Sequence, residues 1–242
     1  QAIRLLDTIA SAFRGMVYWS AGSVDFTQDR PTTPTKLITP ANTIDGNFTR
    51  VSSSRKARHT HVIVGWNNPK MLGDIDYVIV SRDDLVSTLG YRPKEVSAFG
   101  CTDEDQARRV GEWILDTEEN ETEVITWRAS FDQLDALPGE HCWLHDPAYQ
   151  GARFGGRIVS LAGSSVTVDQ LPTLPAGPTY ELNVMMGDGT IETKTILSVS
   201  GNVVTTTASF TGTPVDNSIW TINSTATTGE HVVITGVFEK SA

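Results

Sequence analysis

Short β-prone segments follow one another after Leu137-Pro138-Gly139, and this feature constrains the fold more than any other. Helical periodicity ends there, and turn signals recur about every ten residues. Three of these turns join matching pairs of β-prone segments: Ala162-Gly163-Ser164, Gly187-Asp188-Gly189 and Ser200-Gly201-Asn202. Successive hairpins are typical of a small barrel or sandwich, so residues 138–242 are expected to form an antiparallel β domain.

The last two β-prone segments leave two arrangements open. Residues 218–222 and 231–238 both have the composition of strands. Either segment could close the barrel or sandwich, and the last one could instead return to the preceding domain.

Residues 1–137 combine two helices with strands. Apolar residues recur at helical spacing before Gly15, which predicts an N-terminal helix packed on a sheet: Ile3, Leu6, Ile9, Ala10 and Phe13. A hairpin is expected at 16–26, strands at 59–66 and 76–80, a short helical turn at 83–89 and a strand at 124–129.

The second main helix is expected directly after Cys101. Thr102 is the candidate N-cap, with Asp105 in the position of a capping-box acid. Ala107, Ile114 and Leu115 lie on one apolar face. A helix that leads into antiparallel strands indicates an α+β domain, which we expect to span residues 1–137.

Charge and cysteine content exclude several classes of protein. The 242 residues include 29 acidic and 19 basic side chains, a net charge of −10, which disfavours nucleic-acid binding. Two cysteines do not make a disulfide scaffold, and they suggest a reducing setting. Apolar runs stay below the roughly 18 residues of a membrane span, so membrane insertion is not expected. Because the sequence begins with Gln1, we expect it to be a fragment of a longer chain.

Histidines and a cysteine form the sharpest candidate for enzymatic chemistry. His59 and His61 have the spacing of one strand face, while His141, Cys142 and His145 cluster in a short segment. The paired short spacings of a structural zinc site are missing, and the sequence does not bring the two groups together. We therefore assign no metal site and no cofactor.

Other catalytic patterns are explained more simply by structure. Ser53 and Lys56 match Ser-x-x-Lys without its usual partner motifs. Carboxylates at 103–105 and 118–123 fit a helix cap and a solvated acidic face. Gly155-Gly156 leads into a strand rather than a helix, so it does not form a phosphate-binding loop. No catalytic or cofactor-binding residue is assigned.

A basic cluster precedes the strand at 59–66, in a serine-rich segment. It consists of Arg50, Arg55, Lys56 and Arg58. A solvated loop is the simpler interpretation, and a specific contact with an anion or a protein is the alternative. Six tryptophans are spread along the chain as core packing would require: Trp19, Trp66, Trp113, Trp127, Trp143 and Trp220.

Several segments, in their order and spacing, resemble the central tail tip protein (protein J, or host specificity protein) family of lambda-type siphophages. The resemblance extends over most of residues 1–222 and implies that the domain of residues 1–137 is hub-like. The segments that carry it are 12–19, 44–49, 57–59, 100–102, 107–111, 118–123, 137–139, 145–147 and 155–158. The resemblance implies a non-catalytic piece of the baseplate hub that closes the tail tube in a phage or prophage tail tip. No residue of a family site is carried over.

The resemblance also implies partners and a location. It implies other tail proteins as partners, a homotrimer around the tail axis, and receptor contact through regions outside this chain. The protein would be made in the host cytoplasm and reside in the virion tail tip. Two alternatives remain open: a receptor- or glycan-binding module in the C-terminal β domain, and a metal-dependent hydrolase that degrades the cell envelope.

Overall fold

The computed structural model describes residues 2–20, 22–28, 30, 32–129, 131–214, 217–225 and 229–238. Internal contacts divide the chain into two compact units, each built from two separate stretches of sequence. Unit 1 comprises residues 1–29 and 49–126, and unit 2 comprises residues 30–48 and 127–242. The division of the sequence into domains at residue 137 stays a prediction.

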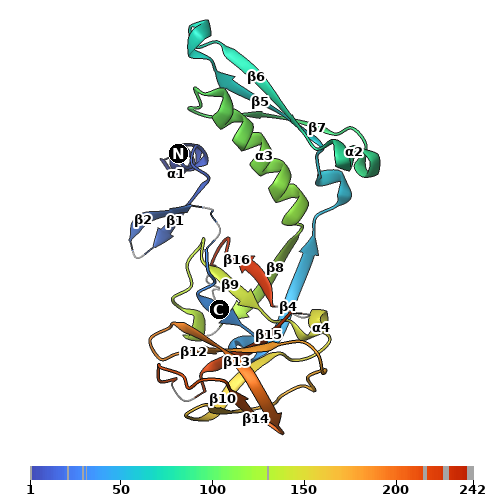
Figure 1. Ribbon diagram of the computed structural model, residues 1–242. Coiled ribbons are helices and arrows are strands. Elements are labelled where there is room, and N and C mark those ends of the chain that lie inside the picture. Colours follow the sequence, from blue (N-terminus) through green and yellow to red (C-terminus); the bar gives the residue numbers. More distant parts are fainter. Residues whose placement is uncertain are drawn as a thin grey trace. The chain divides into compact units, whose positions relative to one another are not determined.

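Unit 1 contains a three-stranded sheet with a long helix packed on it (Figure 1). Its elements are α1 (Ala2–Ser11), β1 (Gly15–Ser20), β2 (Ser23–Gln28), β5 (His61–Asn67), β6 (Ile75–Ser81), α2 (Asp83–Leu89), β7 (Pro93–Ser97) and α3 (Glu104–Asn120). Short 3-10 turns lie at η2 (Arg55–Ala57) and η3 (Pro69–Met71). Strand β5 pairs antiparallel with β6 and parallel with β7.

One face of the β5–β6–β7 sheet is covered by α3. Val62 and Val64 of β5 are fully buried, and Ala107 and Leu115 of α3 complete this core. Val80 also belongs to it. Alternation along the strands explains the arrangement, because every second side chain points to the same side of a sheet.

The N-terminal cap of α3 corrects one expectation. Asp103, not Thr102, is the N-cap, and its side chain accepts a hydrogen bond from the Gln106 backbone N–H at 3.0 Å. Asp103 has the extended backbone that a cap needs, so the helix begins at Glu104. The helix continues to Asn120 and so includes the first part of the acidic segment 118–123.

The first helix exposes much of the face that was expected to be covered. Ala10 is buried, but Leu6 and Ile9 are 38% and 47% exposed. Phe13 lies beyond the end of α1 at Ser11 and is 40% exposed. The side chain of Ile3 lies outside the described residues. The hairpin that follows is confirmed, since β1 and β2 pair antiparallel from Gly15↔Gln28 to Ser20↔Ser23.

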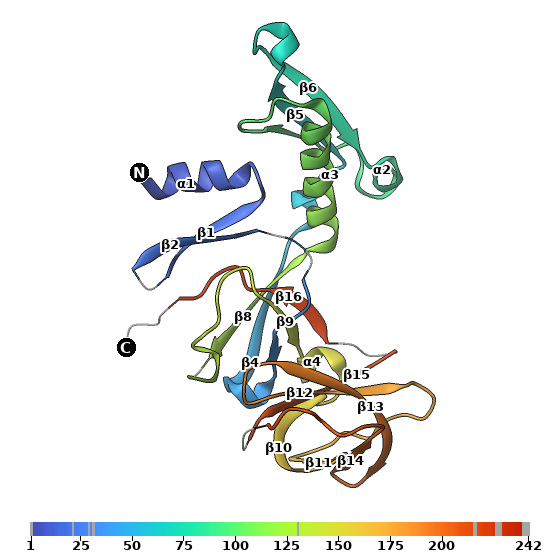
Figure 2. The ribbon, with the colours of Figure 1, turned by 60° about the vertical axis from the view of Figure 1, so that its left-hand side comes forward.

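Unit 2 contains a closed six-stranded barrel (Figure 2). Its strands are β10 (Gly155–Ala162), β11 (Ser165–Val168), β12 (Tyr180–Met185), β13 (Ile191–Ser200), β14 (Val203–Thr206) and β15 (Ile219–Ser224). The three expected hairpins are confirmed as antiparallel pairs. Strand β15 closes the barrel by pairing with both β10 and β12. The core surrounds Trp220, which is fully buried.

A second sheet in unit 2 joins three distant parts of the chain. It has the order β16 (Glu230–Val233), β9 (His141–Leu144), β3 (Lys36–Ile38). Thus the last segment pairs with β9 and is not a strand of the barrel. Unit 2 also contains α4 (Pro147–Gln150) and the 3-10 turns η1 (Pro40–Asn42) and η4 (Phe131–Gln133).

The remaining two strands, β4 (Thr43–Ser52) and β8 (Glu123–Ala129), pair with each other in a two-stranded sheet. The observed fold is therefore α+β and rich in antiparallel strands, with a C-terminal barrel, as expected. Among the described residues, no helix combines the length and apolar character needed to cross a membrane.

Candidate functional site

The two histidines of unit 1 have separate structural roles. His59 precedes β5, and its Nδ1 lies 2.8 Å from Oε2 of Glu118. His61 is the first residue of β5; its Nδ1 lies 3.0 Å from the Thr60 hydroxyl, and its ring contacts Tyr91. The two histidines therefore have different nearest partners. Strand β5 begins at His61, two residues later than the sequence pattern predicts.

Glu118 of α3 connects this helix to β7 and to the segment before β5. Its Oε1 accepts from Lys94 Nζ of β7 at 2.8 Å, while Oε2 accepts from the His59 backbone N–H at 2.9 Å. Burial raises the pKa of Glu118, but the hydrogen bonds from Lys94 and His59 outweigh burial and hold this pKa below its ordinary value. The acidic end of α3 is therefore partly a structural ion-pair network and not only a solvated face.

The histidines of unit 2 lie in and beside the β16–β9–β3 sheet. Nδ1 of His141 lies 2.9 Å from Nε2 of His231, which is on the neighbouring strand β16. The pKa of His231 is lowered by burial and by the adjacent His141. Sequence reasoning did not single out His231, because only the pairing of β16 with β9 brings it to His141.

Cys142 and His145 are also buried. Burial raises the pKa of the Cys142 thiol to about 12, so the sulfur is an uncharged apolar group at neutral pH. Burial also lowers the pKa of His145 to about 4. Nε2 of His145 is buried without a hydrogen-bond partner among the described residues. Within the same residues, no three His, Cys, Asp or Glu side chains gather where they could hold a metal ion.

The other patterns noted in the sequence fall in structural positions. Ser53 and Lys56 are exposed. Gly155 and Gly156 begin strand β10, as expected; a Cβ at Gly156 would lie 2.3 Å from Asp169 Oδ1, which accepts from Trp220 Nε1. Trp220 and Trp66 are buried, whereas Trp19 is 67% exposed, so core packing does not account for all the tryptophans.

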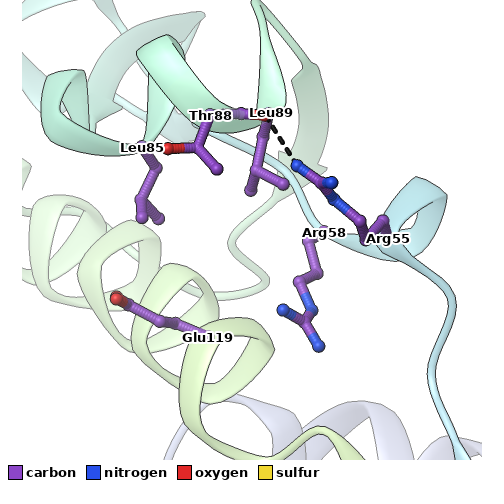
Figure 3. A pocket seen from close by; sticks show the side chains of 6 residues that line it. All are labelled: Arg55, Arg58, Leu85, Thr88, Leu89 and Glu119. Atoms are coloured by element: carbon purple, nitrogen blue, oxygen red, sulfur yellow. Dashed lines mark hydrogen bonds between the residues drawn. The ribbon is translucent and has the colours of Figure 1, made fainter.

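Some side chains of the basic cluster bond to other parts of the protein, and two of them line a cavity. Arg50 pairs with Glu123 at 3.1 Å, and Arg55 Nη2 donates to the Thr88 carbonyl at 2.7 Å. Arg55 and Arg58 line a cavity of about 360 Å³ in unit 1. The other lining residues are Leu85, Thr88, Leu89 and Glu119, as Figure 3 shows. This cavity is the candidate site that the sequence signalled only as a basic segment.

Comparison with known proteins identifies the class of protein. Residues 1–161 match the family model described as "Putative phage tail protein". The match covers more than half of the chain, so the chain belongs to this phage tail protein family.

Two individual relatives have the same printed name, tip attachment protein J. The protein of Escherichia phage SECphi4 is 28% identical over 214 residues, which are 87% of this chain and 19% of that protein. The protein of Escherichia phage SECphi27 is 32% identical over 124 residues, which are 51% of this chain and 10% of that protein. The aligned region is thus about a fifth or less of the length of these relatives.

Proposed function

We propose that the chain is a structural, non-catalytic segment of the phage tail tip, where it forms part of the hub that closes the tail tube and supports host attachment. The family match over residues 1–161 carries this proposal. The printed name of the two relatives supports the location at the tip.

Exposed apolar side chains give the proposal physical support. Ile75, Tyr77 and Ile79 alternate along β6 on the side opposite Val78 and Val80, and they are 58%, 64% and 61% exposed. Apolar groups gathered on one face are typical of surfaces that become covered in an assembly. A hub segment would place such faces against neighbouring subunits, other tail proteins among them.

The proposal includes a homotrimer around the tail axis. Closed rotational symmetry is the common solution for a ring built from one kind of subunit. Light scattering of the full-length protein over a range of concentrations should give three times the mass of one chain. A monomer at every concentration would contradict the trimer.

The non-catalytic role is tested in the phage that encodes the protein. Ser53→Ala and Lys56→Ala are expected to leave particle assembly and infection titre unchanged, because both side chains are exposed and neither is assigned a catalytic role. Electron microscopy counts intact tails, and plaque assays measure infection. Normal particles that fail to infect after either change would contradict the purely structural role.

A further inference from the structure

The cavity in unit 1 has walls from three elements. Arg55 belongs to η2, and Arg58 is the residue directly after η2. Leu85 and Leu89 belong to α2, and Glu119 belongs to α3. Figure 3 shows the Arg58 side chain reaching from its segment towards α3, while that of Arg55 is directed to α2. The site therefore combines guanidinium groups with two leucine side chains.

Arg58 supplies a donor that lacks an acceptor. Its Nε is buried and has no hydrogen-bond partner in the described part of the chain. Arg55 differs, because its Nη2 already donates to the Thr88 carbonyl. A buried N–H without an acceptor is unfavourable, so an acceptor that reaches this group of Arg58 would relieve that cost.

The acidic residue of the cavity does not satisfy Arg58. Oε2 of Glu119 accepts from Arg82 Nη2 at 2.9 Å, so its charge is compensated by a different cation. Glu119 therefore repels an incoming anion less than a free carboxylate would.

A carboxylate with an adjoining apolar group fits these walls. The planar guanidinium matches both oxygens of a carboxylate, and Leu85 and Leu89 offer apolar contact beside it. The volume of about 360 Å³ lies near the lower end of the roughly 300–1,000 Å³ typical of ligand sites. It accommodates a few side-chain groups rather than a folded partner.

We propose that this cavity binds an acidic side chain with an apolar neighbour, presented by a segment of another protein. That the partner is another tail protein rests on the proposed function. The net charge of −10 makes general attraction of acidic partners unfavourable, so recognition depends on the local guanidinium.

The first test uses the unmodified chain and two small probes of the same shape. 4-Methylpentanoate carries the carboxylate and a branched apolar tail, and 4-methylpentanamide has the same tail without the charge. In ¹⁵N-resolved NMR titrations, the carboxylate should shift the amide signals of Arg58, Leu85 and Leu89 with a millimolar Kd. Equal shifts with the amide, or no shifts with either probe, would overturn the proposal.

Matched variants then locate the binding group. Arg58→Gln should weaken 4-methylpentanoate binding about tenfold, as expected for loss of a charge-assisted hydrogen-bonded pair. Lys56→Gln removes the same charge from an exposed position that does not line the cavity, and binding should stay within twofold. Equal weakening by both changes would show general electrostatics and overturn the site.

Inorganic phosphate separates a side-chain site from a site for free anions. Phosphate should bind at least fivefold more weakly than 4-methylpentanoate, because it makes no use of the two leucines. Equal or tighter binding of phosphate would overturn the assignment to an acidic side chain. These results are independent of the tail-tip role, which fails separately if the protein is absent from purified virions.

Discussion

Gly111 allows α3 to approach its sheet closely. A Cβ at this position would lie 2.7 Å from Cγ2 of Val80 and 3.2 Å from Cγ2 of Val64. Alanine would favour the helix by about 1 kcal/mol but would force α3 away from the sheet. Gly111→Ala is therefore expected to lower the free energy of unfolding by about 1–2 kcal/mol, measured by urea denaturation.

The matched control for Gly111 is the next residue on the same helix. Glu112 is exposed, so Glu112→Ala should change the free energy of unfolding by less than about 0.5 kcal/mol. If Gly111→Ala instead raised the free energy of unfolding, helix propensity would outweigh the steric cost, and the close contact of α3 with its sheet at Gly111 would be contradicted.

His145 makes stability depend on pH. Because burial lowers its folded-state pKa to about 4, the unfolded chain binds a proton between about pH 6.5 and 4 that the folded chain does not. This contribution to stability is fully present above pH 6.5 and is lost as the pH falls towards 4. The slope is at most about 1.4 kcal/mol per pH unit.

A variant separates this effect from the other titrating groups. The melting temperature of the His145→Gln protein should fall less between pH 7 and pH 4.5 than that of the unmodified protein. Glu118 and His231 titrate in both proteins, so the difference belongs to His145. Parallel pH profiles would contradict the buried, neutral imidazole.

A charged substitution is expected to affect stability differently in the two longest helices of unit 1, α1 and α3. Leu115 of α3 is 2% exposed, so Leu115→Asp would bury a charge and should unfold the sheet and helix of unit 1. Leu6 of α1 is 38% exposed, so Leu6→Asp should cost about 1 kcal/mol or less. Circular dichroism melting curves distinguish the two. Equal destabilisation would mean that the apolar face of α1 is covered within the chain.

Amphipathic spacing predicts that a segment forms a helix, but not which part of the molecule its apolar face contacts. The residues around Leu6 and Ile114 have the same helical periodicity, and both segments form helices, but the pattern does not say what covers each face. The cap of α3 shows a related limit, since Thr102 and Asp103 are both good capping residues and the backbone conformation decides between them.

The candidate site shows the second limit. Local patterns correctly predict the three hairpins, because each depends on a turn and its flanking residues. The contact between His141 and His231 joins positions 90 residues apart, and the cavity at Arg58 joins η2, α2 and α3. Such sites depend on long-range packing, which residue spacing alone does not specify.

The whole chain combines two units with different secondary structure. We propose that the barrel of strands β10 to β15 is stable without an intact unit 1. In the Leu115→Asp protein, amide hydrogen exchange should become fast in β5 and β6, while β12 and β15 stay protected. Loss of protection in all four strands would contradict independent stability.

As a proposed structural part of the phage tail tip, this chain should be present in purified virions. The most direct measurement is immunogold electron microscopy of purified virions with an antibody raised against residues 1–242. Gold particles are expected at the end of the tail distal to the head. Purified, fully tailed virions that lack the label and lack the protein by mass spectrometry would contradict this role.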